Sequence, residues 1–447
     1  MKFCLPKDFK FGVASSAVQI ESASYEDGKG MDLWQYRYTL APQMFNHHDT
    51  DYGADFYHKY KEDIKLMKEL GINAFRFSIA WSRIYPNGPD EVNQAGIDHY
   101  HDLLDELIKN DIMPLFDLWH CDLPYWVEER GGLANPEFID WFVSYAKTCF
   151  TEYGNKVPYW STVNEPQCNI MAPYAWGFQP PHEKNIKKAN LAGHHMILAH
   201  FKTVKLYREM GFGGKIGIVN HFQLAYGATT DEKDQAAAER DMDFYSYWYT
   251  DAIYSGRYPE SVLEYPYMRD NIPENYQKDL EENFVKSDFI GMNYYGAYNI
   301  RYTKNDVLDY EIAPSDSKDV LGFSPNAAGI FDAVNLAVKR YPGYEIVITE
   351  NGQGKKKWGN YEEELEDDYR VACIRQHLRG VWRCIEAGYP VTGYYHWTFL
   401  DTTEGTGGGY EPMYGLVQVR FDKEERTRVP RKSFYYYKDV ISKGYVE

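Results

Sequence analysis

Residues 346–352 read Ile-Val-Ile-Thr-Glu-Asn-Gly, and this stretch decides the fold. Its β-branched apolar run is typical of a parallel strand that is covered on both faces. Asn351 and Gly352 form a turn signal that ends the strand. Glu350 is therefore expected at the carboxyl end of a buried strand, which is the end that carries the chemistry in an α/β barrel.

The same pattern of strand followed by helix repeats along the whole chain. One helix is marked by an apolar stripe from Phe56 to Leu70, with Gly71 at the expected C-cap. We predict eight strands, over residues 9–16, 74–79, 112–118, 159–163, 216–219, 289–292, 345–349 and 391–395. Helices are predicted over residues 56–70, 97–108, 141–150, 191–210, 331–340 and 364–387.

This alternation predicts an α/β protein with a (β/α)8 TIM-barrel fold. The chain has no linker rich in Pro, Gly or Ser and no sequence repeat of about 20–50 residues. We therefore expect residues 1–447 to form a single (β/α)8 domain. Long segments follow the first, fourth, fifth, sixth and eighth strands, and we expect these βα loops to wall a pocket over the carboxyl end of the barrel.

The composition disfavours several classes of partner. The formal net charge is −18 and the pI is about 5.2, so nucleic acid is not an expected partner. No segment reaches the ~18 apolar residues of a membrane span, and the N-terminus lacks the apolar core of a signal peptide. The six cysteines are scattered singly, as is typical of reduced thiols. We therefore expect a cytoplasmic protein without a membrane partner.

No histidine pair has the spacing of two metal ligands on one helix face, and we expect no metal site. A second carboxylate, Glu165, follows the strand predicted over residues 159–163, so it and Glu350 are expected in the same bowl at the barrel mouth. Paired carboxylates suit glycoside hydrolysis, in which one acid protonates the leaving oxygen and the other attacks the anomeric carbon or activates water. A separation of about 5–5.5 Å predicts retention of configuration, and one of roughly 6.5–9.5 Å predicts inversion. Two solvated loop acids, or a Mg²⁺ site as in isomerases, are the alternatives that these residues leave open.

Four motifs, spread over nearly the whole chain, resemble those of a known family. Thr-Val-Asn-Glu-Pro at 162–166 is similar to the acid/base motif of glycoside hydrolase family 1, and Ile-Thr-Glu-Asn-Gly at 348–352 is similar to its nucleophile motif. Phe-Arg-Phe-Ser-Ile-Ala-Trp-Ser-Arg-Ile at 75–84 and Leu-Pro-Lys-Asp-Phe-Lys-Phe-Gly at 5–12 are also similar to family sequences. The resemblance implies a retaining β-glycosidase of the β-glucosidase and β-galactosidase type, which acts on a small β-glycoside and needs no cofactor.

The resemblance also implies roles for individual residues. Glu165 would be the acid/base, with a raised pKa, and Glu350 would be the nucleophile. Arg76, on the second strand, would help to keep Glu350 ionised, and Asn293 and Tyr295 would orient it. The substrate-binding set would be Gln19, His120, Asn164, Tyr295, Trp397 and Glu404, with Trp397 as the aromatic floor of the sugar subsite.

Two positions depart from the family pattern. Most members have Trp where this chain has Cys121, and most have Trp directly after the loop glutamate, where this chain has Gly405. Both missing rings would border the sugar, so we hypothesise a wider sugar subsite. Glu404 would repel a phosphate group, which disfavours 6-phosphoglycosides. We therefore expect a non-phosphorylated β-glycoside, of the β-glucoside type.

Other functions remain open at this point. The same site would also suit a β-galactoside or β-fucoside, or transfer of the sugar to an acceptor other than water. A carbohydrate-binding pseudoenzyme and a metal-dependent isomerase are alternatives from other classes, although the presence of both Glu165 and Glu350 speaks against the pseudoenzyme. The sequence leaves the oligomeric state undetermined.

Overall fold

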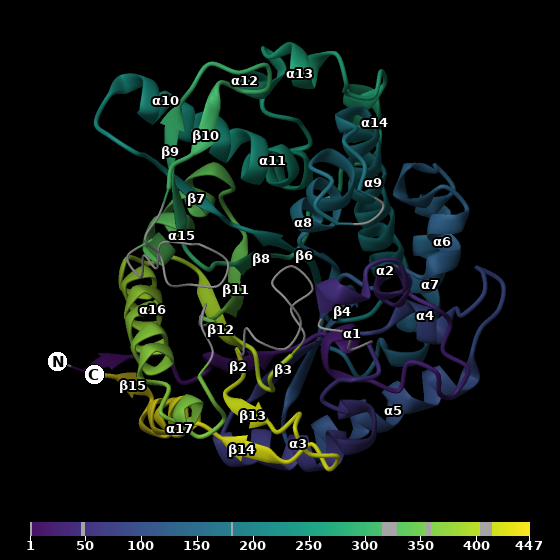
Figure 1. Cartoon of the computed structure of the whole chain (residues 1–447), viewed down its shortest axis with the longest axis vertical. Helices are drawn as coiled ribbons and strands as arrows, with labels where there is room; N and C mark the ends of the chain where they lie inside the picture. The colour runs from purple at the N-terminus through teal and green to yellow at the C-terminus, as the bar shows by residue number, and fades with distance from the viewer. Residues whose placement is uncertain (1, 46–49, 180–181, 315–328, 355–358, 403–413) are drawn as a thin grey trace.

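The computed structural model describes residues 2–45, 50–179, 182–314, 329–354, 359–402 and 414–447. Within them, eight parallel strands close into a barrel in the order β2-β3-β4-β5-β6-β8-β11-β12, with β12 paired to β2 (Figure 1). The strands are β2 (Lys10–Ala14), β3 (Ala74–Ser78), β4 (Met113–Trp119), β5 (Tyr159–Asn164), β6 (Lys215–His221), β8 (Phe289–Asn293), β11 (Glu345–Asn351) and β12 (Val391–Trp397). The predicted (β/α)8 fold is confirmed, and the single-domain organisation stays a prediction.

The barrel strands are covered on both faces, as the apolar run of β11 predicted. Val347 and Ile348 point to opposite faces of β11, and neither has any exposed surface. Helices cover the outer face of a TIM barrel and packed side chains fill its interior, so both faces lose contact with water. Six strands extend one or two residues beyond their predicted ends, to Trp119, Asn164, His221, Asn293, Asn351 and Trp397.

The predicted helices form the outer layer of the barrel (Figure 1). They are α3 (Phe56–Leu70), α5 (Gln94–Lys109), α7 (Phe138–Tyr153), α9 (Ile186–Glu209), α15 (Gly329–Arg340) and α16 (Asp368–Glu386). Gly71 ends α3 with a φ of 90°, the left-handed conformation that glycine adopts without strain. Within the described ranges, every helix is too short or too polar to cross a bilayer.

Several helices begin or end a few residues from their predicted bounds, and the start of α16 has an identifiable cause. α16 begins at Asp368 instead of residue 364, because Glu363–Leu365 forms a separate 3₁₀ turn and Asp367 has a non-helical ψ of 56°. The Asp367 carboxylate accepts a hydrogen bond from the backbone N–H of Ser433, directly after the start of α17 (Lys432–Lys443). A contact with a distant part of the chain therefore sets this boundary.

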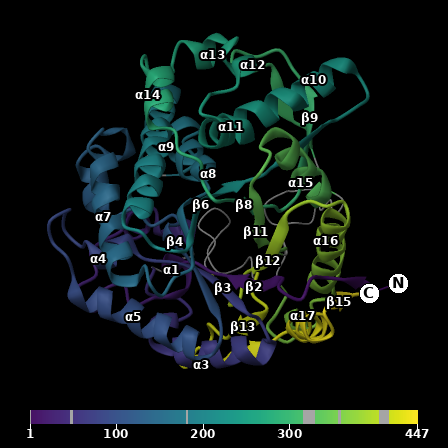
Figure 2. The same cartoon turned by 180° about the vertical axis from the view of Figure 1, so that it is seen from behind.

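Long βα loops cover the carboxyl end of the barrel and contain structure of their own. Three strands form a small sheet in the order β10-β9-β7, which lies beyond β6 and β8 in Figure 1 and in the reverse view of Figure 2. The loop elements include β7 (Leu224–Gly227), α10 (Glu232–Asp241), a π-helical turn at Met242–Tyr247, α11 (Trp248–Ser255), β9 (Ala297–Tyr302) and β10 (Tyr310–Ile312). The sequence predicted the length of these loops but none of these elements.

Candidate active site

Glu350 lies near the carboxyl end of β11, and its carboxylate is held by two donors. Its Oε1 lies 2.5 Å from Nη1 of Arg76, which projects from β3, and its Oε2 accepts a hydrogen bond of 2.6 Å from the hydroxyl of Tyr295. The Arg76 guanidinium has no exposed surface and also pairs with Asp117 at 2.7 Å. A buried cation between two buried carboxylates fixes where the Glu350 side chain lies.

Glu165 lies at a strained turn between β5 and α8 (Pro166–Ile170). Its φ of 47° and ψ of 69° fall in the left-handed region, which costs a residue other than glycine on the order of 1–3 kcal/mol. The proline that follows disfavours the ordinary helical conformation at residue 165, and the Glu165 N–H is held by the carbonyl of Val219 at 2.8 Å. The Glu165 carboxylate is half-buried and accepts a hydrogen bond of 2.8 Å from Asn293 Nδ2.

A path of hydrogen bonds joins the two carboxylates. Asn164 Oδ1 accepts from Arg76 Nη2 at 2.8 Å and from Asn293 Nδ2 at 2.9 Å. Arg76 contacts Glu350, and Asn293 contacts Glu165. The two acids at the ends of β5 and β11 are therefore parts of one connected polar network at the barrel mouth.

Asn293 lies in a different place in this network from the one expected. The described hydrogen bonds of its side chain go to Glu165, to Asn164 and to the hydroxyl of Thr349, which donates to Asn293 Oδ1 at 2.7 Å. None goes to Glu350, although the two residues are paired in the β8–β11 register. The pairing shifts register between Ile348 and Glu350, so Asn293 faces Glu165 and only Tyr295 of the predicted pair bonds to Glu350.

Two of the remaining predicted residues, His120 and Trp397, adjoin the same network. The His120 ring is stacked on that of Trp397 at a centroid distance of 5.5 Å and an angle of 8°, and His120 Nε2 lies 3.2 Å from Asn164 Nδ2. Gln19 is buried, and its Oε1 accepts a hydrogen bond of 2.5 Å from Ser16. Glu404 and Gly405 lie outside the described residues.

Cys121, the first position that departs from the family pattern, is half-buried. Its backbone carbonyl accepts a hydrogen bond of 3.0 Å from the indole of Trp34. Trp34 comes from α2 (Leu33–Leu40), which the sequence analysis did not single out. No pattern in the sequence indicates that Trp34 lies beside Cys121, because the two residues come from separate βα loops.

The pKa values of the two glutamates differ from the sequence expectation. Burial raises the pKa of Glu350, and the charge of Glu165 adds to this rise against the opposing charge of Arg76. Burial also raises the pKa of Glu165, but His221 and hydrogen bonds that include those from Asn293 and Cys168 outweigh it, so this pKa lies below its ordinary value. The sequence predicted the reverse order, because it could not reveal the groups that favour an ionised Glu165.

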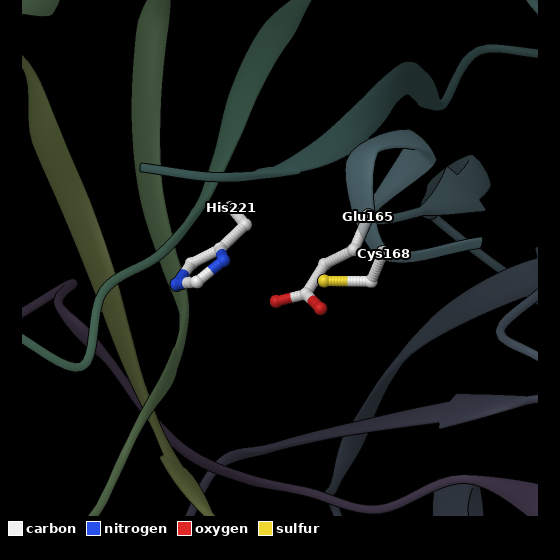
Figure 3. Close-up of side chains that lie close together, drawn as sticks. All are labelled: Glu165, Cys168 and His221. Carbon is white, nitrogen blue, oxygen red and sulfur yellow. The ribbon is translucent and has the colours of Figure 1, made fainter. Parts of the chain in front are cut away.

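Glu165, Cys168 and His221 form a compact cluster of potential metal ligands (Figure 3). One ligand atom from each residue lies within 4.8 Å of those of the other two. Cys168 lies on α8, three residues after Glu165, and His221 ends β6, the strand next to β5 in the barrel. No histidine pair on one helix face marks this arrangement in the sequence, because it depends on two neighbouring strand ends.

Comparison with known proteins decides the family. A model of glycosyl hydrolase family 1 matches residues 1–445. The chain belongs to glycosyl hydrolase family 1. This family 1 protein is therefore an O-glycosyl hydrolase with the TIM barrel of its family, and the resemblance seen in its sequence motifs is confirmed.

Relatives of this family 1 hydrolase match it over almost its whole length. Beta-glucosidase A of Acetivibrio thermocellus is 36% identical over 446 residues, which cover 98% of each chain. The 6-phospho-beta-glucosidase GmuD of Bacillus subtilis is 33% identical over 461 residues, again 98% of each chain. A Thermotoga maritima family 1 glycoside hydrolase, solved with a cyclophellitol analogue transition state mimic, superposes with a TM-score of 0.94 at 32% identity and covers 100% of both chains.

A cavity at the other end of the barrel is no candidate site of this family 1 hydrolase. It measures about 670 Å³ and is lined by residues that include Met113, Pro114, Pro158 and Gly214. These residues lie at or just before the amino ends of β4, β5 and β6, and none of the predicted site residues that the structure describes borders the cavity. In TIM barrels this face contributes to stability, whereas the chemistry takes place at the carboxyl ends.

Proposed function

We propose that the protein is a retaining β-glycosidase that hydrolyses a non-phosphorylated β-glucoside by double displacement. The observation that carries this proposal is the hydrogen-bonded path that links Glu165 and Glu350 through Arg76, Asn164 and Asn293. This path brings two carboxyl groups with different surroundings into one site, as glycosidic bond cleavage requires. The names of two relatives, Beta-glucosidase A and a 6-phospho-beta-glucosidase, support a glucoside as substrate.

In the first step, Glu350 attacks the anomeric carbon while Glu165 donates its proton to the departing oxygen. The C–O bond to the leaving group breaks as the bond between the sugar and the Glu350 carboxylate forms. Arg76 and Tyr295 hold the Glu350 oxygens at 2.5 and 2.6 Å and limit their motion during the attack. In the second step, ionised Glu165 accepts a proton from water, which releases the sugar with retained configuration.

The proton of this reaction belongs to the pair of carboxyls. His221 favours an ionised Glu165 only while its imidazole is protonated, and burial lowers the pKa of His221. At neutral pH this charge is absent, whereas Arg76 beside Glu350 stays protonated. The two carboxyls titrate as one pair, and the first step proceeds from the form in which Glu165 carries their shared proton.

We propose that the sugar lies against Trp397 and His120, with its hydroxyls bonded by Gln19, His120, Asn164 and Glu404. Trp397 and His120 are stacked and nearly parallel, and such a ring face suits the apolar face of a pyranose. Arg76 is already bonded to Asp117, Asn164 and Glu350, so it is not available to a sugar phosphate. Together with the negative charge of Glu404, this supports a non-phosphorylated sugar.

A panel of aryl β-glycosides tests the substrate and the stereochemistry together. It contains the glucoside, galactoside, fucoside, xyloside, glucuronide and 6-phosphoglucoside, and NMR identifies the first anomer that is released. We expect the highest kcat/KM for the glucoside, with the β-anomer formed first. Release of the α-anomer first would contradict double displacement, and a preference for the 6-phosphoglucoside would contradict the proposed substrate.

Two further properties belong to the same proposal. Neither step calls for a cofactor, so a chelator should leave hydrolysis unchanged, whereas loss of hydrolysis on chelation would favour the metal-dependent alternative.

A cytoplasmic location is supported by six cysteines that all carry free thiols. Cell fractionation tests the location, and product analysis at high acceptor concentration separates hydrolysis from transglycosylation.

A further inference from the structure

The acid/base candidate Glu165 has two neighbours that form no bond and transfer no proton in the proposed mechanism. Cys168 is half-buried one turn along α8, and His221 is buried at the end of β6. Figure 3 shows the thiol, the carboxylate and the imidazole directed into one small space. Their ligand atoms lie within 4.8 Å of one another, and this is the one such group of three among the described residues.

A tyrosine from a distant loop holds two of these side chains in place. The hydroxyl of Tyr245 lies 3.1 Å from His221 Nδ1 and 3.5 Å from Cys168 Sγ. Tyr245 belongs to the π-helical turn at Met242–Tyr247, a rare conformation that is frequent at functional sites. Its ring is stacked on that of Trp176 at 5.9 Å and 5°. The thiol and the imidazole are therefore oriented by a shared partner.

The three donors make up a recognisable ligand set. A thiolate sulfur, an imidazole nitrogen and a carboxylate oxygen are the donors that Zn²⁺ accepts in tetrahedral sites, at roughly 2.0–2.3 Å. Ligand atoms of such a tetrahedron lie about 3.3–3.8 Å apart, so closing the cluster requires side-chain movements of about 1 Å. A water molecule would complete the coordination. The cation would balance one thiolate and one carboxylate, which leaves the buried site without net charge.

We propose that Glu165, Cys168 and His221 form an inhibitory site for a thiophilic divalent cation of the Zn²⁺ class. When the cation binds, the S–H bond of Cys168 breaks, its proton passes to solvent, and the sulfur bonds to the metal. The Glu165 carboxylate becomes a ligand and can no longer carry the proton for the leaving group. This inference depends on the proposed role of Glu165 as acid/base.

The chain offers two matched controls. Cys373 and His377 form a second buried pair, with Sγ 3.4 Å from Nδ1, on α16 and without the third ligand of the cluster. Cys121 is a half-buried thiol that directly follows His120. A site that needed only a thiol and a histidine would form at either of these places as well.

Binding is tested with Co²⁺, whose thiolate charge-transfer and d–d absorption bands report sulfur ligation and tetrahedral geometry without turnover. We expect the wild type, Cys373→Ser and Cys121→Ser to show both bands at one equivalent of Co²⁺. Cys168→Ser should lose the charge-transfer band, and His221→Gln should bind at least about tenfold more weakly. A wild type without the band, or a band that survives Cys168→Ser or disappears in Cys121→Ser, would overturn the proposal. Circular dichroism of each variant establishes that it is folded.

Inhibition is tested with Zn²⁺ in an assay of aryl β-glucoside hydrolysis. Each rate is expressed relative to the uninhibited rate of the same variant. The Zn²⁺ concentration that halves this rate should be at least about tenfold higher in Cys168→Ser and His221→Gln than in the wild type, and unchanged in Cys373→Ser. Equal sensitivity of Cys168→Ser and wild type would overturn the proposal. A wild type that shows the Co²⁺ bands but no metal-free hydrolysis would contradict the proposed function and leave the metal site supported, so the two failures are distinguishable.

Discussion

The two ends of β11 each carry a glutamate, and their surroundings differ in charge. At the amino end, Glu345 is paired with two lysines, Lys10 at 3.6 Å and Lys215. At the carboxyl end, Glu350 has one cationic partner, Arg76, at 2.5 Å. The lysines reach solvent, whereas the guanidinium of Arg76 is completely buried.

At the amino end of β11 the cations outnumber the acid, whereas at the carboxyl end the acids outnumber the cation. Arg76 also pairs with Asp117 at 2.7 Å, and Glu165 adds a third carboxylate to the same end. Burial raises the pKa of both β11 glutamates, but hydrogen bonds and lysine charges outweigh it at Glu345, whose pKa is lowered, while the pKa of Glu350 is raised. Glu345, whose charge is balanced by lysines, stabilises the barrel. The pair of Glu165 and Glu350 is only partly neutralised and can therefore hold a proton that is transferred during the reaction.

Replacing each β11 glutamate by alanine should show the difference between the two ends of the strand most clearly. Glu350→Ala should lower kcat by on the order of 10⁴-fold or more, because the covalent step has lost its nucleophile. A small external anion such as azide or formate should restore turnover. Glu345→Ala, on the same strand, is the matched control and should retain a kcat close to that of the wild type. Unimpaired turnover by Glu350→Ala would reject its role as nucleophile.

Arg76→Met should be the most destabilising change at the carboxyl end. It leaves Asp117 and Glu350 buried without their cation, and breaking a buried ion pair in this way costs about 3–5 kcal/mol. Denaturant unfolding of the variant and the wild type measures this loss. Lys10→Met is the control for the amino end and should cost less than about 1 kcal/mol, because Lys10 is partly exposed and lies 3.6 Å from its partner. Equal costs for both variants would contradict the comparison.

Tyr295→Phe should change the pH dependence of hydrolysis. The Tyr295 hydroxyl donates 2.6 Å to Glu350 and lowers its pKa, so removing it favours the protonated form of the nucleophile. The acid limb of the kcat/KM profile should therefore move to higher pH. The maximum of kcat/KM should fall about 10–100-fold, as expected for one hydrogen bond to a charged group. An acid limb that stays in place or moves to lower pH would contradict this role.

Lys215→Ala should have the smallest effect. The lysine side chain is 46% exposed, so its pair with Glu345 is screened by solvent, and Lys10 remains as a second cation. We expect the free energy of unfolding to change by less than about 1 kcal/mol, with kcat unchanged. Thermal unfolding and a standard assay measure both. A large loss of kcat would show that the amino end of the barrel also takes part in the chemistry.

The sequence predicted the barrel because its strands carry strong local signals. The unbroken run Ile346–Ile348 and the turn at Asn351-Gly352 were enough to locate Glu350 at the carboxyl end of a buried strand. The same argument located Glu165 at the end of β5, which is separated from β11 by β6 and β8 in the barrel. Residues at strand ends are therefore predictable wherever the strand itself is unambiguous.

Contacts that depend on loops were not predictable. Tyr245 lies in a π-helical turn within the long segment between β6 and β8, and no periodicity in the sequence indicates that it would meet Cys168 and His221. Asn293 was predicted at the correct end of β8, but a register shift in the neighbouring pairing turned its amide towards Glu165. Side-chain partners in the site therefore follow from tertiary packing that the sequence does not encode locally.

The backbone of Glu165 has a consequence for attempts to improve this protein. A glycine would adopt the left-handed conformation before Pro166 without strain, and the acid would be lost with it. A laboratory selection for heat resistance alone would therefore reward a change that abolishes the function. Every round of such a selection needs a turnover screen, since at this position the more durable protein is the inactive one.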